Sequence, residues 1–186
     1  MEWMDNDRCG LSAKSEQFAA TKIVLALECY HGVATDEMAM QLQEQLPGAH
    51  LVFAGDAMLP EAAINEMVYP YVTDDPVFGY ITPLSLINFF DENKVQALQQ
   101  QIAQQGAGLT IVYGTGAALL APKADLLVYA DMPRWEIQLR FRRNEVGNLG
   151  ISNTGEPFAY KYKRAFFVDW RVCDRHKTSS WPIGIM

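Results

Sequence analysis

Ile23-Val-Leu-Ala-Leu27 is a short, continuous apolar run, and the turn Glu28-Cys-Tyr-His-Gly-Val-Ala-Thr35 leads from it into the amphipathic stretch Thr35–Leu46. Continuous apolar character over a few residues is typical of a strand that is buried on both faces of a parallel sheet. The longer stretch, which is closed by Pro47-Gly48, fits a surface helix. This segment therefore predicts the first strand, turn and helix of an α/β fold.

The same alternation continues along the chain. Further strands are expected at the apolar runs Leu51–Ala54, Leu109–Tyr113 and Leu126–Tyr129. Further helices are expected at Pro60–Met67, Glu92–Gln105 and Pro133–Asn144. Strands and helices in alternation predict a doubly wound, mostly parallel sheet with helices on both faces, whose ligands bind beyond the carboxyl ends of the strands.

One domain is the natural expectation for 186 residues. We expect an α/β domain over residues 21–177, with peripheral segments at residues 1–20 and 178–186, the latter because Thr178-Ser-Ser-Trp-Pro should break any regular element. Three irregularly spaced cysteines favour a reducing cytoplasm over a disulfide framework. The acidic N-terminus is unlike a signal peptide, and no apolar run approaches the ~20 residues of a membrane span. A cytoplasmic protein without a membrane partner is predicted.

Charge is distributed unevenly along the sequence. Residues 134–177 contain ten Lys or Arg against five Asp or Glu, whereas residues 1–133 contain five against seventeen, and the whole chain has a net charge of −7. Cations gathered late in an acidic protein suggest an anion site, because a phosphate needs several fixed donors. A solvated helix face is the alternative. A negative net charge does not favour binding to nucleic acid.

The turn after the first expected strand lacks most of a phosphate-binding P-loop. In the pattern G-x-x-x-x-G-K-[ST], Glu28 stands at the first glycine and Ala34 at the lysine. Thr35, expected as the N-cap of the next helix, still offers a hydroxyl group beside backbone donors and the positive end of the helix dipole. Glu28 would repel a polyphosphate.

The next two turns are also candidate ligand sites. Asp56, just beyond the second strand, could accept a proton from a hydroxyl group and is the candidate catalytic residue, although it could instead cap the helix near Pro60. The turn Gly114-Thr-Gly116 has two glycines of a dinucleotide fingerprint but not the last. Tight turning or close packing of a substrate is therefore favoured there over a Rossmann site.

Cysteine and histidine pairs make a zinc site conceivable. Cys29-x-His31 and Cys173-x-x-His176 together offer four possible zinc ligands. A small buried cysteine and a turn histidine are the favoured interpretation of the first pair. We therefore predict no metal and no other cofactor.

A long C-terminal string resembles a known family. It consists of Ala124–Arg143, Gly147-Asn-Leu-Gly150 and Tyr160–Lys177, with Asp74-Asp-Pro-Val-Phe-Gly79 upstream. Over about residues 22–177, the chain resembles the N-terminal kinase-like domain of long bacterial proteins of the class I mannose-6-phosphate isomerase type. Through that family it is similar in arrangement to uridine-kinase-type P-loop kinases, which have three α/β/α layers. In those kinases, arginines of a helix and lid after the fourth strand close on the phosphates.

The resemblance implies phosphate contacts at Arg140, Arg142 and Arg143, and the second basic segment adds Lys161 and Lys163. In that family, isomerisation belongs to a separate zinc-binding domain that 186 residues cannot also contain. We expect a degenerate kinase-like domain that binds a sugar phosphate or nucleotide and assists a separate or covalently linked isomerase domain. The alternatives are an active small-molecule kinase with an atypical loop, and a structural or homo-oligomerisation module whose arginines pair with carboxylates.

Overall fold

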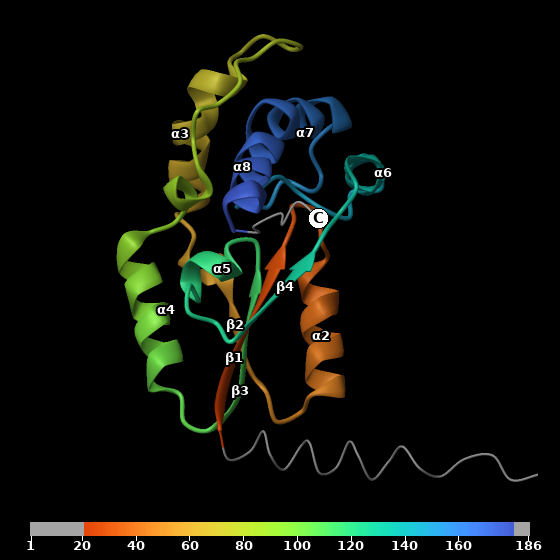
Figure 1. Ribbon diagram of the computed structural model, residues 1–186. Helices are drawn as coiled ribbons and strands as arrows, with labels where there is room; N and C mark the ends of the chain where they lie inside the picture. Colours follow the sequence, from red (N-terminus) through yellow and green to blue (C-terminus); the bar gives the residue numbers. More distant parts are fainter. Residues whose placement is uncertain (1–20, 181–186) are drawn as a thin grey trace, which may run out of the picture.

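The computed structural model describes residues 21–180, and its centre is a four-stranded sheet in which every neighbouring pair of strands is parallel (Figure 1). The strands are β1 (Lys22–Cys29), β2 (His50–Phe53), β3 (Gly108–Gly114) and β4 (Leu126–Ala130), in the order β2-β3-β1-β4. The predicted α/β class and all four predicted strands are confirmed.

Helices cover both faces of the sheet, with α2 on one side and α4 and α5 on the other (Figure 1). The elements before β4 are α2 (Thr35–Gln45), η1 (Ala54–Ala57), α3 (Glu61–Val72), η2 (Leu86–Phe89), α4 (Glu92–Gln104) and α5 (Ala117–Leu120). Those after β4 are α6 (Arg134–Arg142), α7 (Phe158–Arg164), the π-helical η3 (Ala165–Asp169) and α8 (Trp170–Ser180). In Figure 1, α7 and α8 lie above the carboxyl ends of the strands.

The main core lies on the sheet face that carries Ala26, Val112 and Val52, which are paired in register across β1, β3 and β2. Leu86 and Phe89 of η2 belong to the same cluster of buried side chains. The apolar runs that predicted the strands therefore also supply this core, from the central strands β1 and β3 and the edge strand β2.

Helix α3 is longer than predicted. The predicted end at Met67 was wrong, because the helix continues through Pro70 to Val72 and closes where the N–H of Thr73 donates to the carbonyl oxygen of Tyr69 at 2.8 Å. A proline in the last turn removes only one backbone donor, so a helix held by its buried face can tolerate it there.

Strand β4 lies at an edge of the sheet. Leu126 and Val128 are 53% and 38% exposed. The expectation that this strand is buried on both faces was therefore wrong. β4 pairs with β1 alone, and a short apolar run does not reveal whether a strand is central or at an edge.

The last helical segment also extends further than expected. Residues 178–180 are helical, although the sequence predicted a break there. The hydroxyl group of Thr178 donates to the carbonyl oxygen of Asp174 and that of Ser179 to the carbonyl oxygen of His176, each at 2.9 Å, so both side chains bond within the helix. Within residues 21–180, no helix combines the length and the apolar character that crossing a membrane requires.

Candidate functional site

A cavity of about 590 Å³ opens beyond the carboxyl ends of β1, β2 and β3. Its wall comes from four parts of the chain: residues 31–37 after β1, residues from the end of β2 and η1, Thr115 after β3, and most of residues 145–154 after α6. This is the edge at which open α/β sheets bind their ligands, so the cavity lies where the fold class predicts it.

Thr35 lines this cavity, but the prediction that it is the N-cap of α2 was wrong. The N-cap is Ala34, whose φ of −75° and ψ of 87° are not helical, and Thr35 is the first residue of the helix. Ala34 has no side-chain acceptor, so it cannot satisfy the free N–H groups of the first turn. Asp36 and Glu37 line the same wall, which therefore carries both backbone donors and negative charge.

The carboxylate of Glu28 is an anion that the protein itself binds. Glu28 is 1% exposed, and its two oxygens accept hydrogen bonds from the N–H groups of Gly116 at 2.7 Å and Ala118 at 2.8 Å. Gly116 has a φ of 97°, and a Cβ atom there would lie 2.4 Å from Cζ of Phe90. The two-glycine turn is thus a tight turn closed around an internal carboxylate, in agreement with the interpretation favoured over a dinucleotide site.

The cysteine and histidine pairs serve packing and internal hydrogen bonding. Cys29 is 1% exposed, and burial raises the pKa of its thiol to about 11, so it is a small buried hydrophobe as predicted. Nε2 of His176 lies 3.3 Å from Oε2 of Glu28 and joins α8 to β1. Among residues 21–180, no group of three or more His, Cys, Asp or Glu side chains could hold a metal ion.

Lys161, a predicted anion contact, lies inside the protein and outside the cavity wall. It is fully buried, and its ammonium group donates to the carbonyl oxygen of Phe141 at 2.8 Å, to Oδ1 of Asn144 at 2.9 Å and to the carbonyl oxygen of Thr154. Burial lowers its pKa. Because an ammonium group has three donors, protein oxygens engage all of them and tie the end of α6 to residues 145–154.

Lys163 also makes internal bonds. It is 5% exposed, and its ammonium group donates to the carbonyl oxygens of Thr73, at 3.2 Å, and Asp75. It therefore fixes the loop that follows α3, and it does not line the cavity.

Two of the three predicted arginine contacts lie next to the cavity. Arg140 donates through Nη1 to the carbonyl oxygen of Gly32, at 3.1 Å, in the cavity wall, and through Nε to Oε1 of Glu136, also at 3.1 Å. Arg143 donates to the same Glu136 oxygen at 3.0 Å and forms two further bonds with Glu145, which lines the cavity. The structure thus brings Arg140 and Arg143 together with the wall that contains Thr35.

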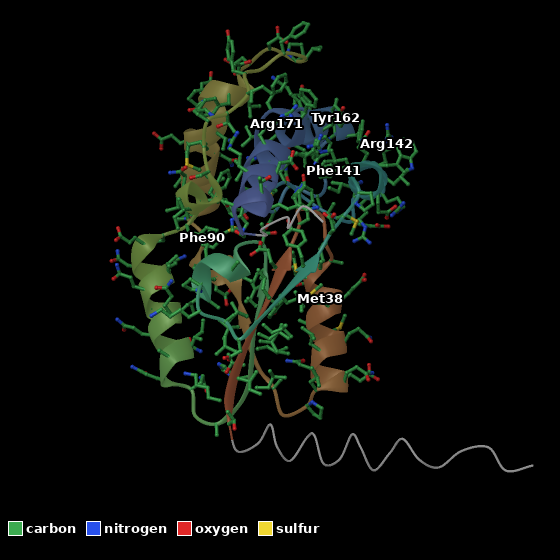
Figure 2. The ribbon with its side chains drawn as sticks, viewed as in Figure 1. Met38, Phe90, Phe141, Arg142, Tyr162 and Arg171 are labelled. Atoms are coloured by element: carbon green, nitrogen blue, oxygen red, sulfur yellow. The ribbon has the colours of Figure 1, made fainter. Side chains whose placement is uncertain are left out.

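Arg142 and Asp56 lie apart from this wall. Cζ of Arg142 lies 3.9 Å from the ring centroid of Phe158, and Figure 2 shows Arg142 pointing away from the body of the protein. Asp56 is exposed in η1 and does not line the cavity, although its neighbour Gly55 does. It also does not cap α3, whose N-cap is Pro60. The catalytic role of Asp56 stays a prediction.

His31 is a residue of the wall that was predicted to serve only as a turn residue. It is 4% exposed, and its Nε2 lies 3.0 Å from the carbonyl oxygen of Gly147, so Nε2 carries the donated proton. Burial lowers its pKa, which keeps the ring neutral. Nδ1 is buried without a hydrogen-bond partner. The sequence offered only a lone histidine in a turn, and its contact with Gly147 depends on the tertiary structure.

A buried network, which the sequence did not reveal, holds the cavity wall at residues 147–150. Oδ2 of the fully buried Asp169 accepts hydrogen bonds from Nδ2 of Asn148 at 2.6 Å and from the N–H of Leu149 at 3.3 Å. Arg164 lies 3.5 Å from the other carboxylate oxygen and donates to the carbonyl oxygen of Leu149 at 3.1 Å. Asp169 and Arg164 therefore position this part of the wall from η3 and α7.

The fold and the cavity define an α/β protein with a ligand-sized cavity at the carboxyl edge of a parallel sheet. A family model described as Domain of unknown function (DUF8485) matches residues 10–183, and the chain belongs to this family. No curated protein and no solved structure matches the chain.

Proposed function

We propose that this domain is a degenerate P-loop-kinase-like module that binds a phosphorylated small molecule, either a sugar phosphate or a nucleotide, in the cavity. The observation that carries the proposal is that the start of α2 lines the cavity, and that Arg140 and Arg143 at the end of α6 form hydrogen bonds with Gly32 and Glu145 of the cavity wall. The first turn of a helix offers backbone donors and a favourable dipole to an anion, and arginine binds phosphate oxygens in pairs.

The arrangement also supports the resemblance to the kinase-like domain of mannose-6-phosphate isomerase-type proteins. The turn that lines the cavity at residues 31–34 follows β1, and the arginine-bearing helix α6 follows β4, the fourth strand. In that family, isomerisation belongs to another domain, so the cavity would bind a phosphorylated metabolite and assist an isomerase domain that is separate from it or linked to it.

Ligand contacts are assigned to Thr35, Arg140 and Arg143. Lys161 and Lys163 would support the site indirectly, because their bonds to carbonyl oxygens fix residues 145–154 and the loop after α3. Phosphoryl transfer is not part of the proposal, because Ala34 stands at the position of the P-loop lysine that would neutralise the transferred group.

One observation favours a second candidate, a structural or oligomerisation module. Arg140 and Arg143 are already paired with Glu136 and Glu145, as a purely structural ion-pair network would be. Exposed networks of this kind are common and need not involve a ligand.

Thermal unfolding with ATP, mannose 6-phosphate or unphosphorylated mannose distinguishes the two candidates. A ligand at 100 times its dissociation constant stabilises the folded state by ~2.7 kcal/mol. For a chain of this length, that corresponds to a rise in the melting temperature of roughly 5–11 °C. We expect such a rise with a phosphorylated compound and none with mannose. If no phosphorylated compound raises the melting temperature, the structural module is favoured.

A further inference from the structure

Arg143 and Glu145 form a two-point ion pair beside the cavity. Nε of Arg143 donates to Oε1 of Glu145 at 2.6 Å, and Nη2 donates to Oε2 at 2.9 Å. Two parallel N–H···O bonds are also the geometry in which a guanidinium group binds a phosphate. The carboxylate of Glu145 therefore offers Arg143 the same pair of oxygens that a ligand phosphate would offer.

The position of the pair allows exchange with a ligand. Glu145 is part of the cavity wall, and the side chains of Arg143 and Glu145 are 47% and 48% exposed. The strength of an exposed ion pair is small because water and salt screen it. Arg143 keeps a second contact to Glu136 at 3.0 Å, which would hold the guanidinium group in place while its other partner changes.

Glu28 provides the contrast within the same protein. Its carboxylate also occupies backbone donors that could hold an anion, but it is 1% exposed and lies against His176. A buried carboxylate held in this way is a permanent part of the structure, because separating it from its partners would leave charge and donors unpaired in the interior. The side chain of Glu145 is exposed, so separating its carboxylate from Arg143 leaves no buried charge unpaired.

We propose that Glu145 is an internal competitor for the ligand's anionic group, and that a phosphorylated ligand binds by displacing the Glu145 carboxylate from Arg143. This inference rests on the proposed function and adds a specificity-determining residue to it. A ligand must offer at least two anionic oxygens to replace both hydrogen bonds, so phosphate monoesters exchange with Glu145 and neutral sugars do not.

Calorimetric titration of inorganic phosphate and of mannose 6-phosphate into the wild type, Glu145→Gln and Glu37→Gln tests the inference. Glu37 lines the same wall and forms no ion pair with Arg143, so its replacement removes one wall charge without touching the pair. We expect Glu145→Gln to bind both compounds roughly fivefold more tightly than the wild type does. This is the change in affinity expected when a ligand no longer has to break an exposed ion pair at the strong end of the usual range. The affinity of Glu37→Gln for the two compounds should increase by less than half as much.

Equal gains in the two variants would mean that the wall charge alone matters, and unchanged affinity in Glu145→Gln would mean that Glu145 does not compete. Either result overturns the inference while the proposed function stands. Failure of the wild type and of Glu145→Gln to bind either compound overturns both. The melting temperature of each variant without ligand should match that of the wild type, and circular dichroism confirms that the fold is retained.

Discussion

Nζ of Lys161 lies 2.8 Å from the carbonyl oxygen of Phe141, so a lysine expected to contact a ligand instead caps the C-terminal end of α6. A cation is favourable at that end of a helix, where carbonyl groups lack partners within the helix. The same ammonium group reaches Thr154 and thus fixes the segment that forms part of the cavity wall. Its influence on the cavity is therefore indirect.

Lys161→Met should destabilise the protein without touching the ligand directly. The substitution keeps an unbranched apolar stem but removes the ammonium donor from both carbonyl oxygens; that of Phe141 keeps the N–H of Asn144 at 3.3 Å, whereas that of Thr154 loses its ammonium partner. A buried group left unsatisfied costs about 1–3 kcal/mol, so the free energy of unfolding in urea should fall by about 1–3 kcal/mol. Arg142→Met, which removes an exposed cation and its contact with the ring of Phe158, should change it by less than about 1 kcal/mol. Equal effects would contradict the capping role.

His31 should make the protein less stable in acid. Burial lowers the pKa of His31 below the value of 6.5 that it has in the unfolded chain, so the unfolded state binds the proton first as the pH falls. The contribution of neutral His31 to the free energy of unfolding is therefore present at neutral pH. It is lost as the pH falls below about 6.5, by up to about 1.4 kcal/mol for each pH unit.

Urea unfolding of the wild type, His31→Gln and His50→Gln at pH 7.5, 6.5 and 5.5 measures this effect. The His31→Gln variant should lose less stability between pH 6.5 and 5.5 than the wild type, and His50→Gln makes the same substitution at a histidine that is only partly buried. If the slopes of the wild type and of His31→Gln coincide, the burial of a neutral His31 is not the cause.

Asp169→Asn should loosen the cavity wall at residues 147–150. The change removes the anionic partner of Arg164, which is nearly buried, and an uncompensated buried charge costs about 3–5 kcal/mol. We expect a loss of stability of that order and faster amide hydrogen exchange at Asn148 and Leu149. Asp174→Asn, at a carboxylate with 41% side-chain exposure, should cost about 0–1 kcal/mol. Unchanged exchange at Leu149 would contradict the positioning role.

The sequence predicted the sheet well because its signal is local. Each strand is a compact apolar run, and each of the helices α2, α4 and α6 begins or ends within two residues of its predicted limits. The exposure of β4 was not predictable in this way, because it depends on which strand lies next to it.

The candidate site was only partly predictable, because its geometry depends on partners that are distant in sequence. Its position after β1 made Thr35 a candidate, and Thr35 lines the cavity; the arginine-rich helix made Arg140 and Arg143 candidates, and they bond to residues of the cavity wall. The burial of Lys161 and the role of Asp169 could not be foreseen, because their partners lie 7–21 residues away in the chain and meet them only in the folded state. A count of charges cannot separate structural cations from those that face a ligand.

The purified chain should not transfer phosphate from ATP to sugars or nucleosides above background. In the proposed kinase-like arrangement, Ala34 would stand at the position of the P-loop lysine, and the carboxylate of Glu28 accepts hydrogen bonds from the turn after β3. A coupled assay of ADP release should remain at the level of a blank without protein. Turnover on the order of 1 per second, which is normal for kinases, would contradict the account of a degenerate loop.

Calorimetric titration of mannose 6-phosphate and ATP into the wild type, the double variant Arg140→Ala/Arg143→Ala and Arg134→Ala tests the central claim most directly. Arg134 is the matched control, because it lies on the same helix but pairs with Asp174, which is outside the cavity wall, whereas Arg140 and Arg143 bond to the wall residues Gly32 and Glu145. We predict that one of the two compounds binds to the wild type and to Arg134→Ala, and that the double variant binds it at least about tenfold more weakly, since each charge-assisted contact contributes about 1.5–3 kcal/mol. Equal binding to all three proteins, or no binding of either compound to the wild type, would contradict the claim that the cavity between α2 and α6 is a phosphate-ligand site.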